Sequence, residues 1–240
     1  MVSRSIRLPL AVNRRFYIGI SLLIVLMAVV GFWPTYVGPL LAGTVDRIPA
    51  IHFHAAVYAG WLAVFVAQVT FASTGRLELH RRLGRIGIYY GFALIPVGIF
   101  AAFAMFAARV DAGLLEEAQR RLLAPLTDMV VFPIFFGAAV AYRRRPEVHK
   151  RLMVVATTTL LIAAVGRMGF LGTPVPMPIF LLVWFLPIFL GMAHDYITRR
   201  LVHPVYVIGL AGLCVLRLRG YLVETEAWLG LSAFLATLVS

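Results

Sequence analysis

Seven apolar runs, each about as long as a bilayer is thick, constrain this 240-residue chain more than any other feature. A helix needs about 20 consecutive apolar residues to cross the hydrocarbon core. The runs are continuously apolar and do not alternate with a period of two, as the strands of a membrane barrel must. Only 13% of the residues are charged, about half the usual fraction in soluble domains. The sequence therefore predicts a single all-α domain, a polytopic transmembrane helical bundle with spans at 16–37, 51–73, 86–108, 124–142, 152–171, 177–197 and 204–222.

Basic residues are concentrated on one side of these predicted spans. Loops on the side of the N-terminus hold most of the 22 lysines and arginines. The loops on the other side hold four, namely Arg47, Arg109, Arg120 and Arg121. Short basic loops remain in the cytoplasm, so we predict a cytoplasmic N-terminus and a multi-pass protein of the bacterial inner membrane. The same asymmetry accounts for the net charge of +12 without a nucleic-acid partner.

Three segments lie outside the plain pattern of spans and loops. The first apolar run follows several arginines but has no small-residue cleavage pattern, so we expect a retained helix. Residues 109–124 have the apolar spacing of a short amphipathic helix on the outer surface. The tail, 224–240, is short for a further span, and we expect it at the membrane interface with Trp228 as an anchor, or as an extension of the seventh helix.

Ionisable residues near the cytoplasmic ends of the spans form the first group of candidate site residues. His80 lies in LELHRRLGR before the third span, and His149 lies in RRRPEVHKRLM before the fifth. Asp195 and His203 lie at the exit of the sixth span and the entry of the seventh. Neutral imidazole is the commonest ligand for zinc, copper and iron, which makes this group a candidate cofactor site. The alternative is that these histidines face lipid phosphates at the interface.

No histidine here has the HxxxH or ExxH spacing that puts two ligands on one helical face, and the lone Cys214 offers no thiolate site. We therefore predict no dedicated metal site built from protein ligands alone. A metal-dependent membrane oxygenase or hydrolase would need more convergent ligands than this chain offers.

A second group of ionisable residues lies toward the other side of the membrane. It comprises His54, Asp128, Arg167 and Arg219. A charged side chain at the bilayer centre costs about 2.5–3.5 kcal/mol even on the insertion scale, so each requires a reason. The group predicts a polar pocket for a small anionic or quinone-like ligand. The alternative is a set of internal ion pairs, together with arginines that extend to the interface.

The arrangement of these motifs resembles a widespread family of bacterial polytopic membrane proteins of unknown function. The resemblance covers residues from about 15 to 230 and implies no activity. It rests on IHFH, Gln68, GRLELHRRLGR, Asp128, RRPEVHKRLM with the following Arg167, and HDYITRRLVHP. The recurrent polar positions that it implies are His54, His80, Asp128, His149, Arg167, Asp195, His203 and Arg219, whereas His194 is particular to this chain.

The HRRLGR element is also similar to the HRxxGR element of ferric-reductase and NADPH-oxidase membrane domains. In those domains, histidines on two helices hold b-type haems, and the similarity implies a single haem between His80 and His149. The stretches IGIYYGFALI and VVATTTLLIA contain no histidine for a second haem. His52 and His54 share one helix and have no histidine partner, so a two-haem path across the membrane is excluded.

Two functions therefore follow from the sequence. The first is an integral inner-membrane protein that binds a small ligand or redox cofactor in its bundle, either one b-type haem or a quinone. The second is a non-catalytic accessory protein or small-solute carrier, whose His–Arg loops serve topology and lipid contacts. The two His–basic motifs enter their spans from the same side, which favours a shared binding role over the inverted repeats of an alternating-access carrier.

Overall fold

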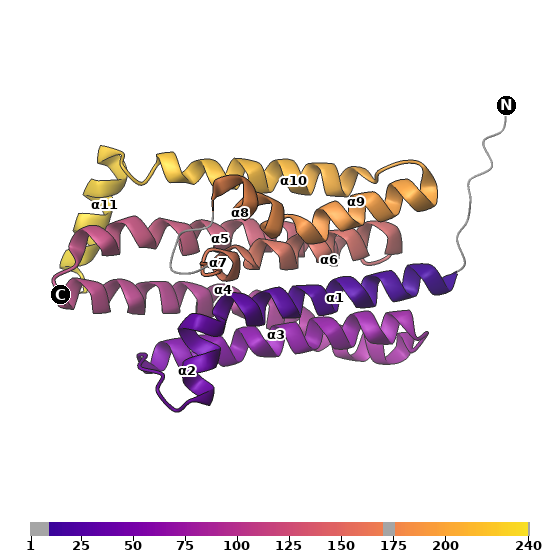
Figure 1. The fold of residues 1–240 in the computed structure, drawn as a ribbon, viewed down its shortest axis with the longest axis horizontal. Helices are drawn as coiled ribbons and strands as arrows, with labels where there is room; N and C mark the ends of the chain where they lie inside the picture. The colour runs from indigo at the N-terminus through magenta and orange to yellow at the C-terminus, as the bar shows by residue number, and fades with distance from the viewer. Residues whose placement is uncertain (1–9, 170–175, 240) are drawn as a thin grey trace.

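The structure is a computed structural model that describes residues 10–169 and 176–239, and these form helices joined by short turns (Figure 1). Six helical segments are long and apolar enough to cross a membrane, and a bent pair of helices raises this to seven. These are the properties of a polytopic membrane protein, so the predicted all-α bundle is confirmed. The helices are α1 (Leu10–Phe32), α2 (Gly38–Leu41), α3 (Pro49–Ser73), α4 (Leu77–Asp111), α5 (Leu115–Ala141), α6 (Pro146–Leu160), α7 (Ile162–Val165), α8 (Met177–Trp184), α9 (Leu186–Arg199), α10 (Pro204–Arg217) and α11 (Glu226–Thr237).

Neighbouring helices in the chain run in opposite directions and pack in sequence, α3 on α4, α4 on α5 and α5 on α6. α1 packs on α3, α6 and α7, while α10 packs on α5 and α6. α8 and α9 meet at an angle of 58° at Phe185 and together make the sixth predicted span. This topology brings the turns after α3, α5 and α9 to one end of the bundle.

The segment 109–124 differs from its prediction as a separate surface helix. Residues from Leu115 onward are the first turns of α5, which continues unbroken to Ala141. Gly113 adopts a φ of 74°, a left-handed conformation that glycine tolerates best, and it closes a tight turn between α4 and α5. Glu116 and Glu117 then begin α5, where acidic side chains favour the positive end of the helix dipole.

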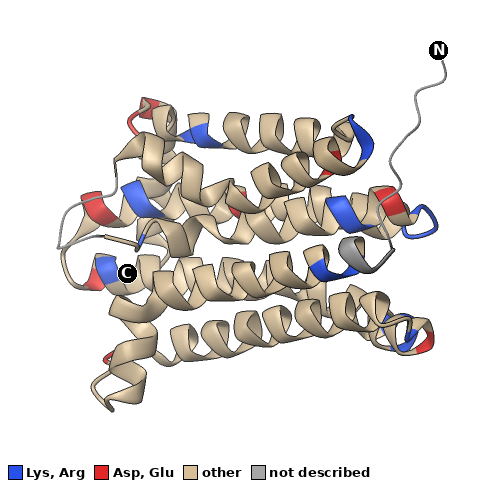
Figure 2. Cartoon of the chain, turned by 45° about the vertical axis from the view of Figure 1, so that its right-hand side comes forward, with Lys and Arg blue, Asp and Glu red and all other residues tan. Residues whose placement is uncertain are grey.

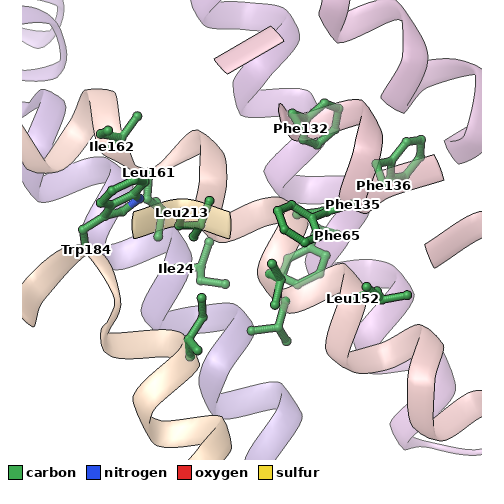
Figure 3. Close-up of a cluster of buried hydrophobic side chains, with 14 of the residues drawn as sticks. Ile24, Phe65, Phe132, Phe135, Phe136, Leu152, Leu161, Ile162, Trp184 and Leu213 are labelled. Atoms are coloured by element: carbon green, nitrogen blue, oxygen red, sulfur yellow. The ribbon is translucent and has the colours of Figure 1, made fainter. Parts of the chain in front are cut away.

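The buried core consists of aliphatic and aromatic side chains from α1, α3, α4, α5, α6, α7, α8, α9 and α10, some of which are drawn in Figure 3. Phe132 and Phe136 stack at 5.4 Å, and Trp61 packs edge-on against both. Gly91 lets the Phe136 ring lie against the backbone of α4, since a Cβ there would lie 2.3 Å from the ring. Such close approaches suit a membrane bundle, where tight van der Waals packing holds helices together.

The tail forms a helix of its own, α11, which crosses the ends of α4 and α5 (Figure 1). Trp228 is buried there, and its indole N–H donates to the carbonyl oxygen of Gln119 at 2.9 Å. The Gln119 amide donates in return to the carbonyl of Leu229 at 3.2 Å. Trp228 therefore anchors the tail to α5.

Charged residues gather toward the two ends of the bundle, and its middle is mostly uncharged (Figure 2). We call the end with Arg76, Arg81, Arg85, Arg143 and Arg200 the basic end, and the other the opposite end. The basic end contains both His–basic motifs.

Candidate functional site

The structure brings His80 and His149 together at the basic end. His80 lies in the first turn of α4 and His149 in the first turn of α6. Their ring centroids are 6.4 Å apart, and the ring planes are inclined at 79°. Two imidazoles from helices that are not consecutive therefore meet near the membrane surface.

Each imidazole is fixed through its Nδ1 atom. His80 Nδ1 lies 3.2 Å from the carbonyl oxygen of Gln68 in α3, and His149 Nδ1 lies 2.8 Å from that of Ala139 in α5. A carbonyl oxygen only accepts hydrogen bonds, so the proton of each neutral ring is on Nδ1. Both Nε2 atoms therefore present a lone pair, the form in which histidine binds a metal.

These hydrogen bonds also have a local structural purpose. Ala139 lies in the last turn of α5, where backbone carbonyls lack partners within the helix. His149 satisfies this carbonyl and ties the end of α5 to the start of α6. His80 ties α3 to α4 in the same way. The two histidines therefore fasten two neighbouring helical hairpins through one ring nitrogen and keep the other available.

The separation of the rings distinguishes between kinds of metal site. Two imidazoles on opposite sides of one metal, with bonds of about 2.0–2.1 Å, have centroids about 6.3 Å apart, whereas tetrahedral ligands have centroids about 5.1 Å apart. The observed centroid distance of 6.4 Å is close to the first value and longer than the second. Among the residues that the structure describes, no group of three or more His, Cys, Asp or Glu could hold a metal ion.

Gln68, which is part of the family resemblance but not one of the predicted site residues, adds a group to this site. Its side-chain Oε1 is buried and has no hydrogen-bond partner among the described residues. Its Nε2 lies 3.3 Å from where a Cβ on Gly84 would be, so the absent side chain lets the amide lie against α4. A buried acceptor without a partner indicates a missing donor, such as a ligand or water.

Asp195, predicted as part of the cofactor group, is instead the partner of Arg151. The Arg151 Nε donates to Asp195 Oδ2 at 2.8 Å, and a second guanidinium nitrogen bonds Oδ1. Both side chains are buried, at 1% and 0% exposure. Arg151 also donates to the backbone and carboxylate of Glu147, one turn earlier, at 2.6 and 2.8 Å. From the sequence, Arg151 is only one of the basic residues whose asymmetry predicts the orientation of the protein.

His203 lies beside this ion pair and is not in contact with the histidine pair. Its backbone N–H donates to Asp195 Oδ2 at 3.2 Å, and its Nδ1 accepts from the N–H of Val205 as the N-cap of α10. Partial burial and the nearby Arg151 guanidinium lower the pKa of His203 below its ordinary value of 6.5. The neutral ring is the form that can accept the capping hydrogen bond.

At the opposite end, Asp128 and Arg219 form an ion pair. The same guanidinium nitrogen also donates to the Thr127 hydroxyl at 2.6 Å and the Ala124 carbonyl at 2.9 Å. The internal ion pair considered from the sequence is therefore present.

The two remaining residues of the second group lie elsewhere. His54 stacks on Tyr58 with centroids 4.1 Å apart. Arg167 follows the end of α7, donates to the Ala163 carbonyl at 2.6 Å and lies 5.0 Å from the centre of the Phe32 ring. Arg167 also borders a cavity of about 300 Å³. Within the described ranges, no hydrogen bond or ion pair joins either residue to Asp128 or Arg219.

No family model, no curated protein and no solved structure matches this chain. The function of this chain is therefore inferred from the geometry of the site.

Proposed function

We propose that this chain is an integral inner-membrane protein that binds one redox cofactor, a b-type haem, between His80 and His149. The observation that carries the proposal is the separation of 6.4 Å between two imidazoles whose Nδ1 atoms both face backbone carbonyls. Fixing Nδ1 in this way orients a metal-binding histidine and raises its basicity.

The protonation of the rings favours a metal over the other ligands considered. A quinone carbonyl and an anionic group both accept hydrogen bonds and would need a donor at Nε2. With Nδ1 protonated, the neutral ring offers a lone pair at Nε2. The histidine pair therefore suits an electron-pair acceptor, which is the chemical character of a metal centre.

A bound haem would supply one-electron redox chemistry, and the residues of the chain would hold and orient it. His80 and His149 would hold it through their Nε2 atoms. The carbonyls of Gln68 and Ala139 would keep the two rings in place. Gln68 Oε1 is an acceptor without a partner in the same region, ready for a water or a donor group of the ligand.

The proposal is tested by an optical spectrum of the full chain, purified in detergent from haem-replete cells, before and after reduction with dithionite. We expect a sharp Soret band and a resolved α band on reduction. His80→Gln and His149→Gln should each abolish these bands. His203→Asn is the matched control, because Asn preserves the N-cap of α10 and the residue lies away from the pair, so its spectrum should equal that of the wild type.

A colourless protein without metal by elemental analysis would refute the haem proposal. It would favour the accessory or carrier function, in which both histidines only fasten helix ends. In that case the two glutamine variants should lower the stability of the protein and change nothing else.

A further inference from the structure

A separate cluster of buried polar groups lies on the other side of the first turns of α6. The side chains of Tyr17 and Tyr206 interact with each other. Within residues 10–169 and 176–239, however, neither tyrosine hydroxyl and neither ring nitrogen of His194 has a partner at hydrogen-bond distance and angle, and all four atoms are buried. Tyr206 is fully buried, and Tyr17 is 9% exposed. Buried side-chain polar atoms nearly always have a partner, either protein or ordered water, so four such atoms in one region require an explanation.

The three side chains converge on one turn of α9. The Tyr17 and His194 rings lie edge to face with centroids 6.2 Å apart. Tyr206 packs against Gly191, where a Cβ would lie 2.5 Å from its hydroxyl oxygen. Gly191 and His194 are three residues apart on the helix and so share one face. The groups without partners therefore come from α1, α9 and α10 but meet in one place.

The Arg151–Asp195 ion pair borders this cluster. The Arg151 guanidinium lies 5.8 Å from the centre of the Tyr206 ring, and Asp195 follows His194 in the chain. Lys150 also lies 4.8 Å from the centre of the Tyr17 ring and pairs with Glu147. Because the neighbouring charges are paired with one another, a charged ligand would bring an uncompensated charge into a buried region. The cluster suits a neutral molecule that both donates and accepts hydrogen bonds.

We infer that Tyr17, His194 and Tyr206 form a buried binding site for one or two water molecules. A water molecule donates two hydrogen bonds and accepts two, and a buried water usually makes about three. Tyrosine hydroxyls and a neutral imidazole offer both donors and acceptors. The site hydrates the interior next to the ion pair and is independent of the proposed haem.

The direction in which the thermal midpoint changes when the tyrosine hydroxyls are removed tests this site. If the hydroxyls are dry, Tyr17→Phe and Tyr206→Phe remove an unsatisfied polar group and leave the thermal midpoint unchanged or higher. If they bind water, each change should lower the midpoint by about 2–4 °C. Tyr90→Phe calibrates the loss of a partnered hydroxyl, since Tyr90 donates to the Val57 carbonyl at 2.8 Å. Tyr196→Phe is the control on α9, because Tyr196 is 56% exposed.

A third variant separates shared water from a direct bond between the two tyrosines. His194→Phe keeps the ring stack on Phe16, which has centroids 3.9 Å apart, and removes both ring nitrogens. Bound water predicts a lower midpoint for this variant too, and density between at least two of the three side chains in a map that shows ordered water elsewhere. Unchanged midpoints for the tyrosine variants, an unaffected His194→Phe, or a map without that density would each overturn the inference.

Discussion

The buried ion pairs at the two ends of the bundle differ in what surrounds them. At the opposite end, Arg219 bonds Asp128, the Thr127 hydroxyl and the Ala124 carbonyl, and all these groups come from α5 and the segment after α10. At the basic end, Arg151 bonds Asp195 across α6 and α9, and unpartnered tyrosine and histidine atoms lie beside it. The Asp128–Arg219 pair therefore resembles a structural contact in which the charged groups find their partners within the protein.

This difference concerns how completely the polar groups around each ion pair are satisfied. A buried polar network that is fully satisfied stabilises one arrangement of helices, whereas groups without partners indicate a ligand or water. The Gln68 amide beside the histidine pair and the tyrosine cluster, which supply the unpartnered groups of both proposed sites, lie at the basic end, whereas His54 Nδ1, near the start of α3, is also buried without a partner among the described residues. The opposite end contains α11, which packs on α4 and α5, and the Asp128–Arg219 pair.

The largest expected effect comes from breaking the Arg151–Asp195 pair. Asp195→Asn leaves a buried guanidinium without its anionic partner across α9, which should reduce the free energy of unfolding by about 3–5 kcal/mol. Thermal unfolding in detergent measures the loss. Glu78→Gln is the control, because the Glu78–Arg82 pair is exposed and should contribute less than about 0.5 kcal/mol. Equally small losses of unfolding free energy in both variants would contradict a large contribution of the Arg151–Asp195 pair to stability.

A smaller effect is expected at the opposite end. Asp128→Asn should cost about 1.5–3 kcal/mol, the range for a hydrogen bond to a charged group, because Arg219 retains Thr127 and the Ala124 carbonyl. The haem bands should remain unchanged, since this pair lies away from the basic end. Loss of the bands in this variant, measured by the same spectrum, would show that the two ends are not functionally distinct.

The smallest effect concerns His203 and pH. The lowered pKa of folded His203 means that the unfolded chain binds more protons once the pH falls to about the ordinary histidine value. The contribution of neutral His203 to the free energy of unfolding is therefore complete above that pH and is lost as the pH falls. Thermal midpoints between about pH 8 and 5 should decline less steeply in His203→Asn than in the wild type. A steeper decline in the variant would contradict a lowered pKa for His203 in the folded protein.

The bundle was predictable from the sequence because its spans depend on length and hydrophobicity alone. The start of α5 was not, because the turn depends on the conformation of Gly113 and the acidic first turn that follows. Apolar spacing in 109–124 suits both a surface helix and a span extension, and only packing against α11 distinguishes them.

The candidate site was predictable in part. The shared side of the two His–basic motifs follows from topology. The approach of His80 to His149 does not, because histidines on one side of the membrane can also face lipid phosphates. The partners of their Nδ1 atoms are backbone carbonyls, which no side-chain pattern encodes. Arg151 follows Lys150 in a basic run, and the sequence does not show which of the two faces inward. The helical spacing of Arg151, Val155 and Thr158 on one buried face is the signal that would have identified it.

The most direct test of the histidine pair is an electron paramagnetic resonance spectrum of the oxidised protein. If His80 and His149 hold a haem iron with their ring planes inclined at 79°, the oxidised protein would give a strongly anisotropic low-spin signal. The account predicts that signal in the wild type and its loss in His80→Gln and His149→Gln. A protein without a low-spin iron signal, or one whose signal survives both substitutions, would contradict it.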